Sequence, residues 1–326
     1  MVKNKTIGYR VFLVFDYVLL ALISILCLLP VVHVAFASFS DPAWVLSQSG
    51  LILWPHGFNV EGYLQVFSNR QLMGSYGNTI LYVVSATAIG LLVTVLGAYP
   101  LSKKEVLFSN TLMLFVSFTM LFNGGMIAFY MVVRNIGMLD TRWSVILPTC
   151  VSAFNLILVR TAMSTVPKDL EESAMLDGAG PVRIMFQIYM PLIKATIATV
   201  VLYYAVAHWN SWFNASIFLT DRSKFPLQLI LREILIANDT ASTATQSGQV
   251  AGNADLYKQL VKYCTIMAAT VPVLCFYPFI MKYFEKGVMI GAIKDNRCNL
   301  LKIQKERRKE RYENDKNANP YLHRPN

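Results

Sequence analysis

The chain has 326 residues, of which 55% are hydrophobic and only 15% are charged, whereas soluble domains carry about 25% charged residues. Six mostly apolar stretches contain no Asp, Glu, Lys or Arg, and each reaches the roughly 17–25 residues that a helix needs to cross a bilayer. These stretches are residues 17–40, 71–102, 106–133, 143–159, 195–220 and 263–281. A chain of ordinary soluble domains is therefore excluded, and we predict an all-α integral membrane protein.

The apolar stretches predict six transmembrane helices, because backbone polar groups in hydrocarbon must be satisfied within their own segment. In chain order the expected helices cover residues 15–39, 77–101, 108–133, 143–163, 192–213 and 262–284. Between the first two, the uncharged stretch 42–60 is interrupted by Pro and Gly and carries two Trp residues. We expect an interfacial or re-entrant segment outside the membrane there.

The basic residues indicate the orientation of these helices. If the N-terminus lies in the cytoplasm, 21 of the 29 Lys and Arg residues fall on the cytoplasmic side, which is the side where such residues concentrate. We therefore expect both termini in the cytoplasm, with a transmembrane domain over residues 1–294 and a basic tail over 295–326. This distribution explains the net charge of +10 without nucleic acid, and the scattered cysteines give no sign of a metal site.

Two long loops join the later helices. The external loop, about residues 214–261, contains the small, polar and turn-rich stretch 238–255, which we expect to project or to pack on a partner. The cytoplasmic loop, about residues 164–191, is patterned instead. This second loop carries the functional signal.

The cytoplasmic loop predicts two short helices. Pro167 suits the first turn of a helix, with Ser164 or Thr165 available as its cap. Gly178 suits the end of that helix, because glycine readily adopts the left-handed conformation found just past a helix. Pro181 begins the second helix, which leads back into the membrane. From spacing alone, an ordinary amphipathic connector is an equal alternative.

At these residues the chain resembles the permease subunits of bacterial ATP-binding-cassette (ABC) importers. The hallmark of those subunits is the EAA loop: Glu-Ala-Ala, three residues, Gly, nine residues, Ile, any residue, Leu-Pro. Here the motif runs from Glu172 to Pro191 with matching spacing throughout. The departures are Ser173 in place of Ala and Met190 in place of Leu, both small changes in volume that should not abolish docking.

The resemblance covers roughly residues 8–294 and extends to the maltose-type sugar permeases, in particular to MalG-like subunits of the LplC-like branch, which is associated with complex oligosaccharides. Further segments that carry it are residues 152–167, 208–215 and 284–294. It implies the type I ABC importer permease fold, with six transmembrane helices and a cytoplasmic coupling helix. It also implies an oligosaccharide permease in the bacterial cytoplasmic membrane, which forms the membrane path together with a second permease.

Further partners implied by the resemblance are two ATPase subunits and an extracellular solute-binding protein. ATP and Mg would bind to the ATPase subunits, and no cofactor is expected in this chain. The sequence agrees, since it contains no Gly-Lys dipeptide and hence no phosphate-binding loop of the GxxxxGK[ST] type. We therefore expect a transport subunit and not an enzyme.

The candidate site residues fall into two groups. By resemblance, ATPase coupling is assigned to Glu171, Glu172, Ser173, Ala174, Asp177, Gly178, Ile188 and Pro191. For Asp177, helix capping is an equal alternative. Polar and aromatic residues of the spans are candidates for the solute path, namely Asn78, Asn123, Asn155, Tyr203, His208, Trp209, Asn210 and Trp212. The competing interpretation of the Trp and Tyr residues is an aromatic belt at the membrane interface.

Other interpretations remain open. The same architecture could import a peptide or a lipid-like solute. An ion-coupled secondary transporter is disfavoured because the six apolar stretches, 17–40 onward, hold no acidic residue and show no convincing repeat. External basic residues weakly favour acidic oligosaccharides such as uronates; these are Arg70, Arg222, Lys224 and Arg232. On the second expected span, Ala86, Gly90 and Gly97 form a stripe of small residues that predicts close helix packing.

Overall fold

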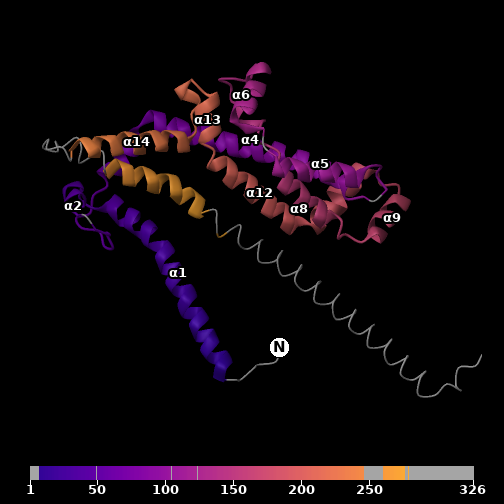
Figure 1. Cartoon of the computed structure of the whole chain (residues 1–326), viewed down its shortest axis with the longest axis horizontal. Coiled ribbons are helices and arrows are strands. Elements are labelled where there is room, and N and C mark those ends of the chain that lie inside the picture. Colours follow the sequence, from indigo (N-terminus) through magenta and orange to yellow (C-terminus); the bar gives the residue numbers. More distant parts are fainter. Residues whose placement is uncertain are drawn as a thin grey trace, which may run out of the picture. The chain divides into compact units, whose positions relative to one another are not determined.

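The computed structural model describes residues 7–48, 50–103, 105–122, 124–245, 260–275 and 278 (Figure 1). Within these residues all regular secondary structure is helical, as expected. The helices form two compact units. The first is built from residues up to 92, from 119–152 and from 204–276, and the second contains 93–118 and 153–203.

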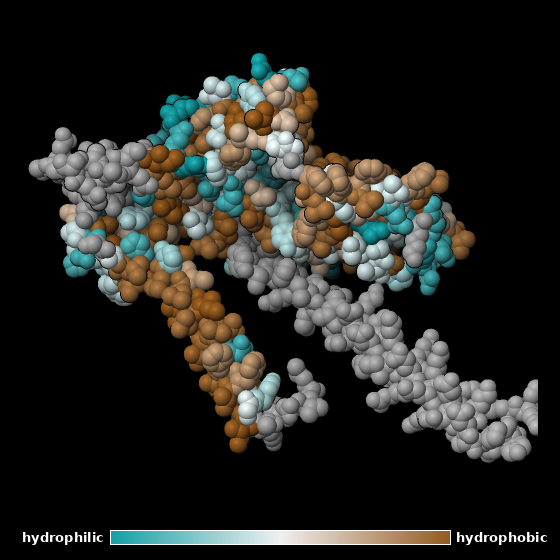
Figure 2. Space-filling model, in the orientation of Figure 1, coloured by the Kyte–Doolittle hydropathy of each residue, from teal (hydrophilic) through white to brown (hydrophobic). Residues whose placement is uncertain are grey.

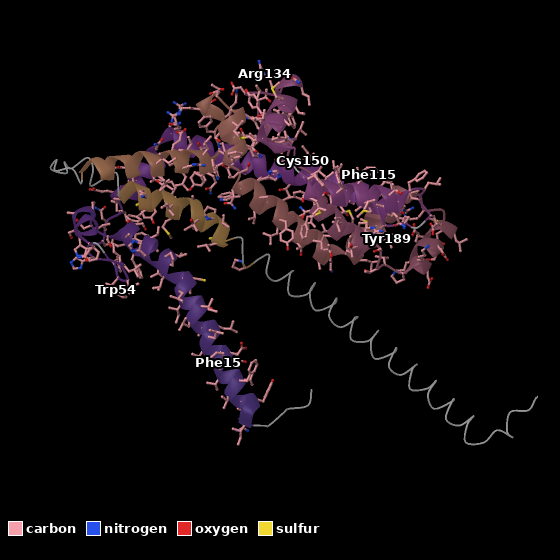
Figure 3. All side chains as sticks on the ribbon, in the orientation of Figure 1. Phe15, Trp54, Phe115, Arg134, Cys150 and Tyr189 are labelled. Atoms are coloured by element: carbon pink, nitrogen blue, oxygen red, sulfur yellow. The ribbon has the colours of Figure 1, made fainter. Side chains whose placement is uncertain are left out.

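The first unit contains the N-terminal helix and the segments expected outside the membrane. Its helices are α1 (Ile7–Phe39), α2 (Pro42–Ser47), α3 (Glu61–Ser68), most of α4 (Arg70–Leu101), α6 (Gly125–Asn135), α7 (Trp143–Ile146), α13 (Phe213–Phe218), η2 (Arg222–Lys224), α14 (Leu227–Thr245) and Leu260–Cys275. Apolar side chains cover α1 along nearly its whole length (Figure 2), and Phe15 stands away from the helix (Figure 3). Such a surface suits lipid or a partner helix.

The second unit contains the expected coupling loop. Its helices are the end of α4, most of α5 (Ser109–Leu121), α8 (Ala153–Met163), α9 (Lys168–Leu176), α10 (Pro181–Ile184), the π-helix η1 (Met185–Tyr189), α11 (Met190–Leu192) and the first part of α12 (Lys194–Trp209). In Figure 1, α9 is seen next to α5 and α8 at the tip of this unit. The EAA loop, residues 164–191, therefore forms one end of the second unit.

Two of the six expected spans are unbroken helices. α1 and α4 are long and apolar enough to cross a membrane, and they contain the predicted spans 15–39 and 77–101. The predicted span 262–284 is described as a helix over Leu260–Cys275, and most of the remainder lies outside the described residues, as does the predicted tail 295–326.

Two of the other three spans are wrong as single straight helices. In 108–133, α5 ends at Leu121 and α6 begins at Gly125, whose φ of +80° lies outside the right-handed helical range and favours glycine. In 143–163 the helix stops after Ile146, and Pro148 prevents its continuation into α8. The predicted span 192–213 contains a single helix, α12, over Lys194–Trp209, and the bend of 88° that separates it from Pro181–Leu192 lies before α12.

Small residues on α4 allow the close packing that the sequence predicted. Ala86 is fully buried. A Cβ atom on Gly90 would lie 2.1 Å from the backbone oxygen of Cys150, which follows α7 in the first unit. In the second unit, a Cβ atom on Gly97 would lie 3.2 Å from Cδ1 of Leu156. Backbone thus approaches α4 directly at Gly90, where any side chain would prevent the contact.

Candidate functional site

The first helix of the EAA loop, α9, ends as the sequence predicted. Gly178 has a φ of +79°. Its N–H donates to the Met175 oxygen at 3.0 Å, and the Ala179 N–H donates to the Ala174 oxygen at 2.9 Å. This pair of bonds is the Schellman motif, which satisfies the last carbonyl groups of a helix. Gly178 therefore sets the direction in which the chain leaves α9.

The predicted cap of α9 is wrong. The hydroxyls of Ser164 and Thr165 donate to backbone oxygens of Thr161 and Ala162, each at 2.8 Å, so they serve the end of α8. Pro167 itself occupies the position before α9, with no side-chain hydrogen bond to the helix. Its fixed φ of −60° and extended ψ of 134° separate the two helices.

The second part of the loop returns towards α12 through a distorted helix. Pro181 begins α10, as predicted, and the chain then widens into the π-helix η1 just before Pro191. Proline has no N–H and crowds the carbonyl of the preceding turn, and a local π-turn is one way in which a membrane helix satisfies the backbone groups that a proline frees. Of the predicted residues here, Ile188 is half-buried and Pro191 is exposed.

The two adjacent acidic residues of α9 face different surroundings. Glu171 is buried and forms an ion pair with Lys103. Its carboxylate also accepts a hydrogen bond from the Tyr189 hydroxyl at 2.7 Å. Burial by itself raises the pKa of this carboxyl, but the hydrogen bonds from Lys103 and Tyr189 outweigh burial and hold the pKa below its ordinary value. Glu172, in contrast, is exposed.

The outer surface of the loop combines polar and apolar side chains. Among the predicted coupling residues, Glu172, Ser173, Asp177 and Gly178 are exposed, and Ala174 is half-buried. Sequence reasoning missed Leu176 and Val182, which are 89% and 64% exposed. Large apolar side chains at such exposure are accessible to a partner, and their position beside the motif was an available signal.

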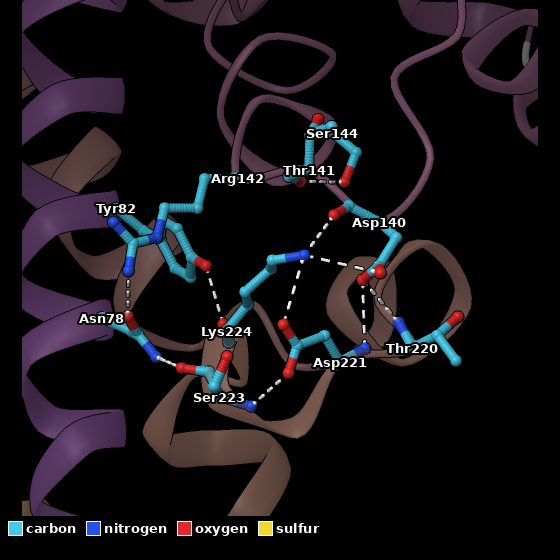
Figure 4. A network of polar contacts seen from close by, with 10 residues as sticks. All are labelled: Asn78, Tyr82, Asp140, Thr141, Arg142, Ser144, Thr220, Asp221, Ser223 and Lys224. Atoms are coloured by element: carbon cyan, nitrogen blue, oxygen red, sulfur yellow. Dashed lines mark hydrogen bonds and ion pairs between the residues drawn. The ribbon is translucent and has the colours of Figure 1, made fainter.

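Polar contacts in the first unit attach residues 220–227 to α4 (Figure 4). Lys224 donates to the Asp140 backbone oxygen at 2.7 Å and pairs with the carboxylates of Asp140 and Asp221 at 3.4 and 3.3 Å. Asn78 of α4 donates to the backbone oxygen of Ser223 at 2.7 Å. The side-chain amide of Asn78, a predicted solute-path residue, therefore donates to the protein backbone.

The remaining solute-path candidates lie in diverse surroundings. His208 is 5% exposed, and its Nε2 atom, like Nε1 of Trp209, has no hydrogen-bond partner among the described residues. Asn210 is exposed and donates to the backbone oxygen of Val206 at 2.9 Å. In the second unit, Asn155 is buried, and Tyr203 is exposed. Asn123 lies outside the described residues.

Trp212 has a cationic neighbour. The guanidinium carbon of Arg232, on α14, lies 3.5 Å from the centre of the Trp212 ring, which is the arrangement of a cation–π contact. Trp212 is half-buried and Arg232 is exposed. The pair thus joins α14 to the segment 208–215 that sequence analysis singled out.

Comparison with known proteins identifies the chain. Residues 86–290 match the family described as "Binding-protein-dependent transport system inner membrane component". The chain belongs to this family. It is therefore a multi-pass inner-membrane component of a binding-protein-dependent transport system, and the prediction of a transport subunit instead of an enzyme is confirmed.

Individual relatives cover nearly the whole chain. Protein LplC of Bacillus subtilis (strain 168) is 39% identical over 291 residues, which is 89% of this chain and 97% of LplC. YtcP of the same strain, a polygalacturonan/rhamnogalacturonan transport system permease protein, is 38% identical and covers 87% of this chain and 99% of its own length.

A solved structure agrees. The chain matches a subunit in the crystal structure of a bacterial ABC transporter involved in the import of the acidic polysaccharide alginate, with a TM-score of 0.76 and 30% identity. The match covers 86% of this chain and 98% of that one. The predicted fold of an ABC importer permease is confirmed.

Proposed function

We propose that this chain is a permease subunit of an importer for acidic oligosaccharides. The observation that carries the proposal is the 38% identity, over nearly the full length, to a polygalacturonan/rhamnogalacturonan permease. The structural likeness to a transporter for alginate, another acidic polysaccharide, points the same way. Galacturonate units carry carboxylates, so the solutes named for both relatives are anionic.

The charges of the external segment support an anionic solute. Among the described residues, Arg222 pairs with Glu233, and Lys224 pairs with Asp140 and Asp221. No carboxylate of the described residues lies within ion-pair distance of Arg232, which stacks on Trp212 instead. The Arg232 guanidinium can donate paired hydrogen bonds to a carboxylate such as that of a uronate ring, and its contact with Trp212 holds it in place.

The EAA loop is the proposed site of energy coupling. Glu172, Ser173, Ala174, Asp177 and Gly178, together with Ile188 and Pro191, would form or shape the surface that docks on an ATPase subunit. The exposed apolar Leu176 and Val182 support this role, because a partner that covers them removes apolar surface from water. ATP and Mg would bind to two such ATPase subunits, with no cofactor in this chain.

The remaining partners follow from the same proposal. A second permease would complete the membrane path, and an extracellular solute-binding protein would deliver the oligosaccharide. Both termini would lie in the cytoplasm, which places the EAA loop on the ATPase side. The basic tail, residues 295–326, would then lie in the cytoplasm as well.

Uptake by the complete transporter tests the proposal. The chain is reconstituted in liposomes with its second permease, ATPases and binding protein, and uptake of oligogalacturonate is compared with that of a maltodextrin of equal length. We expect ATP-dependent uptake of the acidic sugar. Uptake of the neutral sugar alone, or of peptides instead, would reject the acidic substrate.

A variant of the transporter tests the role of Arg232. Arg232→Gln should slow uptake of oligogalacturonate about 10-fold, the equivalent of about 1.4 kcal/mol for one charge-assisted contact. Arg222→Gln is the matched control, because Glu233 already neutralises that residue. Equal effects of both substitutions would show that general positive charge, and not the Arg232–Trp212 pair, matters.

A further inference from the structure

Three segments of the second unit meet at one carboxylate. Glu171 of α9 pairs with Lys103, two residues beyond the end of α4, and accepts hydrogen bonds from Tyr189 of η1 and, at 3.3 Å, from Tyr99 of α4. Lys103 also donates to the Tyr189 hydroxyl at 2.6 Å. Its ammonium lies 4.6 and 4.2 Å from the ring centres of Tyr99 and Tyr189. Figure 3 labels Tyr189 within this region.

This cluster is closed to a docking partner. The side chains of Lys103 and Glu171 are only 12% and 11% exposed, and the donors around the carboxylate all come from the chain itself. Neighbouring residues of a helix point about 100° apart, so Glu172, the next residue, can face outward while Glu171 faces inward. Glu171 could reach another protein only by leaving three internal partners.

We infer that Tyr99, Lys103, Glu171 and Tyr189 form a clamp that transmits movement of α9 to α4. The inference rests on the proposed coupling role of the EAA loop and assigns Glu171 to force transmission within this chain, not to ATPase contact. Charge-assisted hydrogen bonds among partly buried groups are strong and directional. A displacement of α9 therefore pulls on the end of α4 and on the return segment η1 together.

A second, exposed ion pair provides an internal comparison. Lys168, the first residue of α9, pairs with Glu105 in the segment after α4, and the two side chains are 56% and 74% exposed. Exposed pairs contribute little to stability and are screened by salt. This pair joins the same two segments as the clamp, but as an exposed ion pair it is too weak to hold them together. It therefore serves as a matched control.

The test measures solute moved per ATP hydrolysed in the complete reconstituted transporter, together with retention of the ATPase during purification. Glu171→Gln keeps the shape of the side chain and removes its charge, and Tyr189→Phe removes a single hydroxyl. In both variants we expect ATPase retention and ATP hydrolysis within about twofold of the unmodified transporter. Solute moved per ATP should fall at least about fivefold, the lower bound of a typical coupling between sites.

The control Glu105→Gln should change none of these quantities. Because the two clamp substitutions remove the same contact, the double variant should lose much less than the product of the single losses. A merely destabilising change would lower the amount of transporter and would leave the ratio of solute to ATP unchanged. The ratio therefore separates transmission from stability.

Several results would overturn the inference. Glu172→Lys reverses the charge of an exposed residue of the proposed docking surface and should release the ATPase. If Glu171→Gln releases the ATPase as well, Glu171 is a docking residue, and the proposed function stands without the clamp. An unchanged ratio in both Glu171→Gln and Tyr189→Phe would also reject the clamp. If the Glu171→Gln variant does not insert in the membrane, the ratio measured for Tyr189→Phe alone tests the clamp. If Glu172→Lys leaves ATPase retention intact, it is the proposed coupling surface that fails.

Discussion

Substitution of Gly178 isolates the backbone geometry of the EAA loop from its contacts. The residue has a φ of +79°, and a Cβ atom built there would meet nothing within 4 Å. A side chain therefore clashes with no part of the described structure, and its cost comes from the left-handed backbone. That cost is about 1–2 kcal/mol for an ordinary L-residue, and it is smaller for Asn, which adopts this conformation more readily.

The expected effect on coupling follows from that energy. A strain of about 1–2 kcal/mol lowers the population of the observed loop conformation roughly 5- to 30-fold. ATPase retention by the purified complex and ATP-dependent uptake should fall in the order Gly178, Asn, Ala, Val, with Val lowest because β-branched residues suit positive φ least. Gly180→Ala is the control, since Gly180 has a φ of −73° and equally open space.

Two outcomes would refute this reasoning. Uptake by Gly178→Val at the unmodified rate would show that the turn after α9 does not control docking. An equal loss in Gly180→Ala would show that glycine is needed here for a reason other than its backbone conformation. Either result would separate the position of Gly178 in the motif from its left-handed geometry.

Three further predictions concern stability. Gly90→Ala should lower the stability of the purified subunit by about 3 kcal/mol, because its Cβ would strike the Cys150 backbone. Gly77→Ala on the same helix should instead stabilise the subunit by up to about 1 kcal/mol. Thermal unfolding in detergent measures both changes. Asn78→Leu should cost about 1–3 kcal/mol by leaving the carbonyl groups of Ser223 and Phe225 without their donor, measured the same way. The pKa of Glu171 in the folded subunit is lowered, so the stability that the Glu171 carboxylate contributes should be fully present above the ordinary carboxyl pKa. That contribution should disappear as the pH falls through the pKa of the folded state. Glu171→Gln should flatten that part of the stability–pH curve.

Local signals in the sequence predicted the features that depend on neighbouring residues. The end of α9 at Gly178 and the start of α10 at Pro181 follow from backbone preferences of single residues, and both are confirmed. The uninterrupted apolar runs of α1 and α4 likewise predicted helices. The breaks after Leu121 and Ile146 had local signals too, since Gly125 and Pro148 lie inside the apolar stretches. Spans predicted only from the absence of charged residues do not take such helix-breaking residues into account.

The clamp could not be predicted, because its members are distant in the sequence. Lys103 and Glu171 are separated by 68 residues, and no periodicity relates the end of one helix to a later loop. The motif also cannot tell which of two adjacent acidic residues faces inward. Only the packing of α9 against Lys103 and Tyr189 makes that distinction, and it divides residues that the sequence placed in one functional group.

This division has a physical reason. A docking helix transfers force only if it is held on both sides, by the partner and by its own chain. Glu172, Leu176 and the turn at Gly178 are exposed on α9 and form the proposed docking face, while the buried Glu171 binds Lys103 and Tyr189. Exposed charge in water is screened within about 8 Å at physiological salt, whereas the enclosed Lys103–Glu171 pair is screened much less. If an ATPase docks on the exposed face as proposed, the attachment inside the permease is the less screened of the two, so motion of the ATPase would move α4 before it detached the loop.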